Sequence, residues 1–420
     1  MQEIELLEPG REFSLDELKI THGDVNTRDI SRNLEADEGT TMLRVVSDRK
    51  SRHNRITQLD ASFEREGEPA EYSLKLKRLL EKPNGDPKGH NGGRLSIAGD
   101  ILRIIHPPPI WRSRLEGEIF PHSPRPLSAD EEYLTQEWIH GKTFEELALG
   151  LHDKIQETDD PATISSTMQL LQTYHQAMMQ TTINFQEFMG SELVATRMNA
   201  YSMYGPRPFT QDYVHKKLGS YLRKIMTKNV HERSMTEREG EGFIERILDP
   251  KNGFVRQMYM NLQPTTQYHG ETRAQSIILG DGRAENFVLR ESHLDATDLD
   301  EIVEGTVITE FDDAKCMNPS ADLIILADPY FSTAATPDNM MYFYNEKVED
   351  IDCLEPVDLQ RWGWTGAFGF IRLARHAETV EEEKFYLEQL ANCANYVGDN
   401  FKHLILDGIV EPRLSTITTG

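Results

Sequence analysis

The sequence predicts an α+β fold in two lobes: a small β-rich lobe over residues 1–140 and a large, mainly helical lobe over residues 141–420. Three observations lead to this prediction. The chain has 420 residues, which is too long for one ordinary core and sufficient for two. Several segments before residue 80 alternate apolar and polar side chains as strands do. After residue 143, apolar side chains recur mostly at helical spacing.

The strands of the first lobe are expected in segments rich in β-branched or alternating apolar residues, namely 42–48, 56–64 and 71–79. Gly67-Glu68-Pro69 separates the last two and is typical of a hairpin turn. A loop rich in Gly, Pro and Asn follows over 83–93. A helix is expected over 95–105, where Pro107-Pro108-Pro109 ends it. One further strand, within 132–140, would connect the lobes.

The second lobe is expected to be helical over 143–153, 163–190, 211–228 and 239–262, and again from about 320 to 407. Two strand-like segments, 276–289 and 306–313, interrupt the helices and are expected to form a hairpin. The aromatic residues near the C-terminus, Trp362 and Trp364 with Phe368 and Phe370, could line a substrate pocket or pack in the core.

Composition limits the classes of function. The net charge of −25 would repel nucleic acid and would favour a cationic small molecule, although it could also serve solubility alone. No apolar run approaches the roughly 18 residues of a membrane span, and the acidic N-terminus lacks the features of a signal peptide. Three cysteines without metal-ligand spacing indicate neither a disulfide framework nor a zinc site. We therefore expect a cytoplasmic protein that binds neither nucleic acid nor membrane.

The strongest local pattern is Leu279-Gly280-Asp281-Gly282-Arg283-Ala284-Glu285-Asn286, which lies between two short apolar runs. It resembles the His-Gly-Asp…Asn loop of the aminoglycoside phosphotransferase and choline kinase family, which has a two-lobed protein-kinase-like fold. The resemblance implies that Asp281 orients or accepts the proton of a substrate hydroxyl, and that Asn286 holds a magnesium ion. On its own, the pattern would equally suit a polar turn.

A second segment supports this resemblance. Thr309-Glu310-Phe311 resembles the family's Ile-Asp-Phe segment, whose acid binds magnesium, and Asp322-Leu323 follows Glu310 at the family's distance of 12 positions. The resemblance thus makes Glu310 a metal ligand and Asp322 a structural brace for the loop that carries Asp281. The alternative for Glu310 is a solvated acid beside Asp312 and Asp313.

The nucleotide-binding residues are also indicated by resemblance. Lys75, in Tyr72-Ser73-Leu74-Lys75, matches the lysine that binds the ATP phosphates, although Lys77 faces the same side of the strand and could replace it. Ser51 and Asn54 match the family's nucleotide loop. Glu137 and Trp138 match the strand whose backbone binds adenine. Asp100 is the best acidic partner for Lys75 that the sequence offers.

Three departures from the family pattern leave an alternative open. Leu279 replaces the family's histidine, Glu310 replaces an aspartate, and the nucleotide loop has few glycines. The resemblance implies an ATP- and Mg²⁺-dependent kinase for a hydroxyl of a small molecule, including cationic ones. The departures favour a catalytically inactive pseudokinase that serves as a nucleotide-binding or interaction module. The sequence does not name the acceptor or decide between ATP and GTP.

Overall fold

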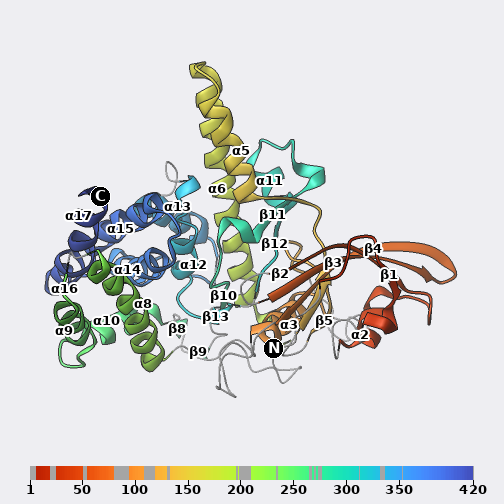
Figure 1. Cartoon of the computed structure of the whole chain (residues 1–420), viewed down its shortest axis with the longest axis horizontal. Helices are drawn as coiled ribbons and strands as arrows, with labels where there is room; N and C mark the ends of the chain where they lie inside the picture. Colours follow the sequence, from red (N-terminus) through yellow and green to blue (C-terminus); the bar gives the residue numbers. More distant parts are fainter. Residues whose placement is uncertain are drawn as a thin grey trace.

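The structure is a computed structural model. It describes residues 6–18, 25–50, 54–79, 94–107, 119–129, 133–194, 197, 210–232, 235–263, 267–268, 271–272, 277–311, 313–331, 336–351 and 353–419. Figure 1 shows a β-sheet on the right, a group of helices on the left, and the long helix α6 between them. A small sheet beside a large helical part confirms the predicted α+β class.

The sheet has six antiparallel strands in the order β1-β2-β3-β4-β6-β5. Four of them confirm predicted strands: β2 (Met42–Lys50), β3 (Asn54–Arg65), β4 (Glu68–Leu79) and β6 (Tyr133–Glu137). The turn between β3 and β4 uses Glu66 and Gly67, whose φ angles of 54° and 80° suit a two-residue hairpin turn. The two remaining strands, β1 (Glu12–Ser14) and β5 (Pro126–Ala129), were too short for the sequence pattern to indicate.

Two hydrophobic clusters form the cores. The smaller one covers one face of the sheet and includes Leu43, Leu59 and Leu74, with Ile30 from helix α2 (Thr27–Leu34). The larger one fills the helical part. Helix α3 (Arg94–Ile105), which confirms the helix expected at 95–105, contributes Leu102 to the larger cluster. This helix packs against β5 and β6 of the sheet, so the larger cluster extends from the helical part to this side of the sheet.

The helical part begins with α5 (Phe144–Gln156), which a Thr143–Glu146 capping box starts, and α6 (Pro161–Gly190). The segment expected to be one helix over 239–262 is two, because Pro250 and the left-handed Gly253 separate α9 from α10. The other helices are α8 (Gln211–His231), α9 (Glu237–Leu248), α10 (Phe254–Leu262), α11 (Leu299–Gly305), α12 (Ser320–Ile325), α13 (Pro337–Val348), α14 (Leu359–His376), α15 (Val380–Ala394), α16 (Asp399–Ile405) and α17 (Glu411–Thr419).

The two segments expected to form a hairpin over 276–313 pair with each other in part, but they belong to two small sheets that also include strands from outside this range. Strand β10 (Ile277–Ile278) pairs with β13 (Lys315–Cys316), whereas β11 (Phe287–Arg290) lies between β12 (Thr306–Ile308) and β7 (Gly141–Thr143). A separate two-stranded pair, β8 (Gln267–Tyr268) and β9 (Glu271–Thr272), precedes them. The loop after β10 and the turn after β12 are consequently free of strand pairing and can carry functional side chains.

Helix α14 organises the region around these loops. A Cβ at Gly366 would lie 2.2 Å from the Cys393 sulfur, and one at Gly369 would lie 2.4 Å from an Ile324 methyl group. These glycines therefore let α15 and α12 approach α14 closely. Trp362 and Trp364 are fully buried core residues, in agreement with the packing alternative. Within the described ranges, no helix is long and apolar enough to cross a membrane.

Candidate active site

The loop from Leu279 to Asn286 connects β10 to β11. Gly280 has a φ of +75°, and a Cβ there would lie 2.1 Å from the carbonyl oxygen of Asp313. Only glycine combines this backbone conformation with such a close approach. The loop is thereby packed against the segment that follows Glu310, so two motifs that are about 30 residues apart in the sequence share one place in the fold.

Asp322 holds this loop through its backbone. Its carboxylate accepts hydrogen bonds from the N–H groups of Leu279 and Gly280, both at 2.8 Å, and from the Gln186 amide at 3.1 Å. Burial raises the pKa of Asp322 to about 6 and outweighs the opposing effect of these hydrogen bonds. At neutral pH the group is still ionised, and it satisfies two backbone donors that would otherwise be buried without a partner.

Asp281 lies beside two arginines. Arg283 Nε lies 3.2 Å from its Oδ1 atom, and an Arg372 Nη atom lies 3.4 Å from the same oxygen. Arg372 comes from α14 and also donates to the carbonyl of Gly280 at 2.6 Å. Asn286 donates its amide N–H to the carbonyl of Asp281 at 2.7 Å, which closes the loop on itself. Nothing local in the sequence marked Arg372, because it is one of three arginines on α14 and lies in no motif.

Glu310 lies across from the sheet and contacts both candidate lysines. Lys75 Nζ lies 2.7 Å from one carboxylate oxygen, and Lys77 Nζ contacts the other. Burial would raise the pKa of Glu310, but the two ammonium groups outweigh it and hold that pKa well below its usual range. Neither lysine is solvated, since their side chains are only 13% and 7% exposed. Glu310 therefore links the sheet to the helical part.

The structure does not bring Asp100 to Lys75. Asp100 lies 3.4 Å from Arg103 on its own helix, and the acid that contacts Lys75 is Glu310. The reason is topological: α3 presents Asp100 toward its own last turn, while the turn after β12 places Glu310 next to β4. Among the described residues, Glu310 thus takes the place that the sequence interpretation gave to Asp100.

The remaining nucleotide-side residues are only partly described. Ser51 lies outside the described residues, and Asn54 begins β3. The N–H of Glu137 donates to the carbonyl of Arg125, and the N–H of Trp138 donates to the carbonyl of Ser73. Both backbone donors expected to face adenine therefore already have partners within the sheet.

The residues Asn286 and Glu310 offer the oxygen ligands that Mg²⁺ prefers. They lie near each other because Thr309 N–H donates to the carbonyl of Asn286 at 2.9 Å. The amide nitrogen of Asn286 faces Asp281, so its amide oxygen is the atom that can be offered to a cation. Among the residues that the structure describes, no group of three or more His, Cys, Asp or Glu side chains could hold a metal. The donor types fit magnesium, but Glu310 is shared with two lysines.

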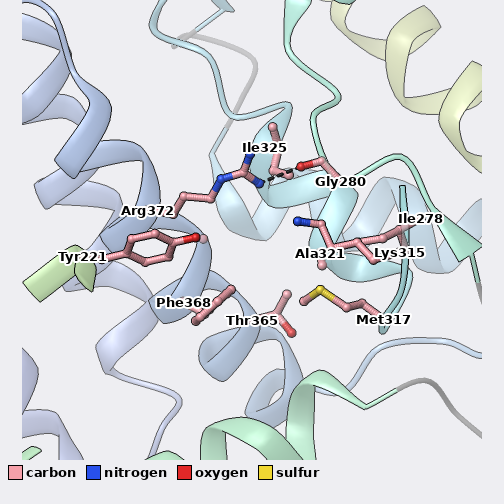
Figure 2. A pocket seen from close by; sticks show the side chains of 11 residues that line it. Tyr221, Ile278, Gly280, Lys315, Met317, Ala321, Ile325, Thr365, Phe368 and Arg372 are labelled. Carbon is pink, nitrogen blue, oxygen red and sulfur yellow. Dashed lines mark hydrogen bonds between the residues drawn. The ribbon is translucent and has the colours of Figure 1, made fainter. Parts of the chain in front are cut away.

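A pocket lies directly beside the loop, between α8, α12, α14 and the short β10–β13 pair (Figure 2). Gly280 and Arg372 form its edge toward Asp281. Its lining residues are Tyr221, Ile278, Gly280, Lys315, Met317, Ala321, Ile325, Thr365, Phe368, Gly369 and Arg372. Of the four aromatic residues considered for a substrate pocket, only Phe368 lines it.

Comparison with known proteins gives structural matches only. No protein family model matches the chain, and no curated protein is similar to it in sequence. The structure is similar to an aminoglycoside phosphotransferase from Alicyclobacillus acidocaldarius, with 10% identity over 92% of this chain and 93% of that chain, and a TM-score of 0.38. It is also similar to an ethanolamine kinase from Plasmodium vivax, with 9% identity over 90% of this chain and 86% of that chain, and a TM-score of 0.40.

Both of these proteins belong to the class that the sequence motifs resemble. At this level of identity and superposition, the matches bear on neither the activity nor the substrate of this chain.

Proposed function

We propose that this protein is an ATP- and Mg²⁺-dependent phosphotransferase that transfers the γ-phosphate to a hydroxyl of a small molecule. The observation that supports it most is the pair of hydrogen bonds from Leu279 and Gly280 to Asp322. They hold the loop with Asp281 and Asn286 against α12, while the hydrogen bond from Thr309 N–H to the carbonyl of Asn286 keeps the turn with Glu310 beside this loop. An ATP-consuming enzyme of this kind would act in the cytoplasm.

Each residue takes a role that suits its chemistry. Lys75 would bind the α- and β-phosphates, and Asn286 and Glu310 would hold Mg²⁺. When bound, the ion would neutralise charge on the β- and γ-phosphates. Asp281 would orient the acceptor hydroxyl and take its proton. Asp322 acts through the backbone of the loop and is a positioning residue.

Phosphate transfer requires the Glu310 carboxylate to break at least one of its ion pairs with Lys75 and Lys77. In the structure, two ammonium groups occupy its two carboxylate oxygens. The nucleotide phosphates are stronger partners for ammonium groups than one carboxylate, because they carry several negative charges. Nucleotide binding would therefore draw Lys75 and Lys77 toward the phosphates and leave the carboxylate to the metal.

The second candidate is a pseudokinase, and the contact between Lys77 and Glu310 favours it. A second ammonium group on a metal-binding carboxylate opposes the binding of a divalent cation by direct repulsion. In that case the lysines could bind nucleotide phosphates without a metal. The two candidates therefore differ in whether nucleotide binding depends on Mg²⁺.

A thermal-shift experiment with ATP, with and without Mg²⁺, tests the proposal. At a nucleotide concentration a hundredfold above Kd, binding stabilises the folded state by about 2.7 kcal/mol. A phosphotransferase should show this shift only when Mg²⁺ or Mn²⁺ is present, and AMP should not reproduce it. A shift of equal size in EDTA supports the pseudokinase. The absence of any shift with Mg-ATP, Mg-GTP and Mn-ATP would remove the phosphotransferase and leave only a pseudokinase that acts as an interaction module without nucleotide.

A further inference from the structure

The side chains that line the pocket beside the 279–286 loop differ in charge from the protein as a whole, although Asp281 and Asp313, which are not part of the lining, lie 3.4 and 3.6 Å from Arg372. The chain has a net charge of −25, yet the described residues that line the pocket include two cations, Lys315 and Arg372, and no carboxylate. A site for an ammonium ligand needs carboxylates or several aromatic faces. This lining therefore disfavours the cationic acceptor that the overall charge suggested.

Three hydrogen-bond donors converge on the pocket. Figure 2 shows the Tyr221 hydroxyl, the Arg372 guanidinium and the Lys315 ammonium pointing into the same space, from α8, α14 and β13. Burial raises the pKa of Tyr221, and three nearby cations, Arg372, Lys315 and Arg375, only partly oppose this, so the phenol is a neutral donor at neutral pH. A guanidinium, an ammonium and a phenol together form a donor set that suits a carboxylate or a phosphate group.

The two cations are held in place by the loop itself. Arg372 is oriented by the Gly280 carbonyl at 2.6 Å and by Asp313 at 3.6 Å. The side chain of Lys315 runs over Gly280, because a Cβ at Gly280 would lie 2.6 Å from the Lys315 Cε atom. Ordering these long side chains before a ligand arrives reduces the entropy lost on binding. The pocket is thus arranged in advance for an anion.

Apolar side chains cover the rest of the wall. Phe368 and Ile325 line the pocket beside the two cations, and Thr365 adds one hydroxyl. The free space is about 20 Å³, which admits one charged end group beside the two cations, so the rest of a ligand would extend out of the pocket.

Asp281 lies 3.4 Å from Arg372. The anionic end would therefore have to lie on the Tyr221 and Lys315 side of Arg372, away from the Asp281 carboxylate, for the hydroxyl end to lie near Asp281.

We propose that this pocket binds the anionic group, a carboxylate or a phosphate, of a small hydroxylated acceptor, whose hydroxyl then faces Asp281. The description of this ligand as an acceptor rests on the proposed phosphotransferase function. The anion site itself rests only on the pocket and its donors.

Four three-carbon probes of matched size test the proposal: glycerate, glycerol 3-phosphate, glycerol and 3-aminopropane-1,2-diol. Saturation-transfer NMR at low ionic strength detects millimolar binding of each, and low salt avoids screening of the charges. We expect glycerate or glycerol 3-phosphate to bind, and the neutral and amino probes to bind at least about tenfold more weakly. The comparison of glycerate with glycerol 3-phosphate shows which anion the site prefers.

Variants locate the binding. Lys315→Met should weaken the binding of the anionic probe by about tenfold or more, and Tyr221→Phe should weaken it by several-fold. Each variant loses one hydrogen-bond donor to the anion. Lys216→Met on the same helix as Tyr221 is the matched control, since Lys216 is 72% exposed and lies outside the pocket lining. It should bind like wild type. The milder Tyr221→Phe keeps the test valid if Lys315→Met does not fold.

The outcomes separate this inference from the proposed function. Preference for the amino probe or for glycerol, or no binding of either anion, overturns the anion site even if Mg-ATP binds. Displacement of the bound probe by Mg-ATP overturns the assignment to an acceptor, because the nucleotide would then occupy the same pocket. Binding of an anionic probe together with Mg-ATP, lost in Lys315→Met, supports the inference. Anion binding without any response to Mg-ATP leaves the anion site standing and rejects phosphotransfer.

Discussion

The ion cluster at Glu310 makes a sharp prediction about stability. In Glu310→Gln, the ammonium groups of Lys75 and Lys77 lose their common counter-ion although their side chains are only 13% and 7% exposed. Breaking a buried ion pair by removing one partner costs about 3–5 kcal/mol. We expect about 3 kcal/mol at pH 7, because the side chain of Glu310 is 18% exposed and water can partly solvate the lysines.

The pH dependence of this loss has a definite sign. The folded state lowers the pKa of Glu310 from its ordinary value of 4.5, so the ionised carboxylate stabilises the fold at every pH above that value. The contribution declines as the pH falls below 4.5 toward the folded pKa. The difference in free energy of unfolding between wild type and Glu310→Gln should therefore reach its full size at pH 7 and become smaller below pH 4.5.

Urea unfolding followed by tryptophan fluorescence measures the difference in free energy of unfolding. The shift of the unfolding midpoint gives this difference when the two proteins have the same m-value. Glu388→Gln is the control, since Glu388 meets Lys384 at 3.9 Å on an exposed helix face and should change stability by less than about 0.5 kcal/mol. The double variant Lys77→Met/Glu310→Gln should recover part of the loss because one buried charge is removed. Equal stability of Glu310→Gln and wild type at pH 7 would refute the reasoning.

The same variant tests the proposed metal role. Glu310→Gln should lose the Mg²⁺ dependence of nucleotide binding more than Asp322→Asn does, because a ligand carboxylate cancels the charge of the ion directly. Magnesium titrations of both variants decide this. If Glu310→Gln keeps the wild-type dependence, the ligand is one of the neighbouring acids, Asp312 or Asp313.

Four further outcomes are expected. Asp281→Asn should reduce ATP hydrolysis or transfer by about 10²–10⁴-fold while Mg-ATP affinity stays near wild type, and unchanged hydrolysis would exclude Asp281 as the catalytic acid–base group. Activity should fall as the pH drops through about 6, because the protonated Asp322 loses its charge and part of its capacity to accept hydrogen bonds from the loop. The Asp322→Asn variant should be less active at every pH and should show no fall in activity near pH 6. The raised pKa also means that the contribution of Asp322 to stability declines as the pH rises from 3.8 to about 6, so wild type should lose stability relative to Asp322→Asn over this range. Gly280→Ala should cost about 3 kcal/mol or more, because a Cβ there meets the Asp313 carbonyl at 2.1 Å. Gly253→Ala, at a similar φ of +77° but with open space, should cost only about 1 kcal/mol, and equal losses would show that the close contact is unimportant.

The sequence predicted the elements whose pattern is local. The strands at Met42–Lys50, Asn54–Arg65 and Glu68–Leu79 and the helix at Pro161–Gly190 were all expected within a few residues. Each carries a periodic run of apolar residues, and that period follows from the geometry of one element alone. Of the hairpin expected over 276–313, the pair β11–β12 forms, but β10 pairs with β13 and β7, at Gly141–Thr143, joins the other side of β11. These additional strands could not be predicted from the segment alone, because pairing depends on partners elsewhere in the chain.

In the candidate active site, too, the sequence indicated the local motifs but not the contacts between distant residues. Asp281, Asn286, Glu310 and Asp322 were named from the resemblance of their segments to the family's motifs, and the structure brings them around one loop, although their roles stay predictions. The partner of Lys75 could not be found in this way. Glu310 is 235 positions away from Lys75, whereas Asp100 is nearer in the sequence but pairs with Arg103.

By itself, the sequence determined the two-part α+β organisation and the short motifs, because hydrophobic period, turn residues and motif spacing are properties of neighbouring residues. The tertiary structure alone decided the electrostatic surroundings of these motifs. It placed two lysines on Glu310, set Arg372 against Asp281, and gathered Tyr221, Lys315 and Arg372 at one pocket. The physical reason is that Coulomb energies and desolvation depend on distances of a few ångströms between side chains, and packing sets those distances among residues far apart in the chain.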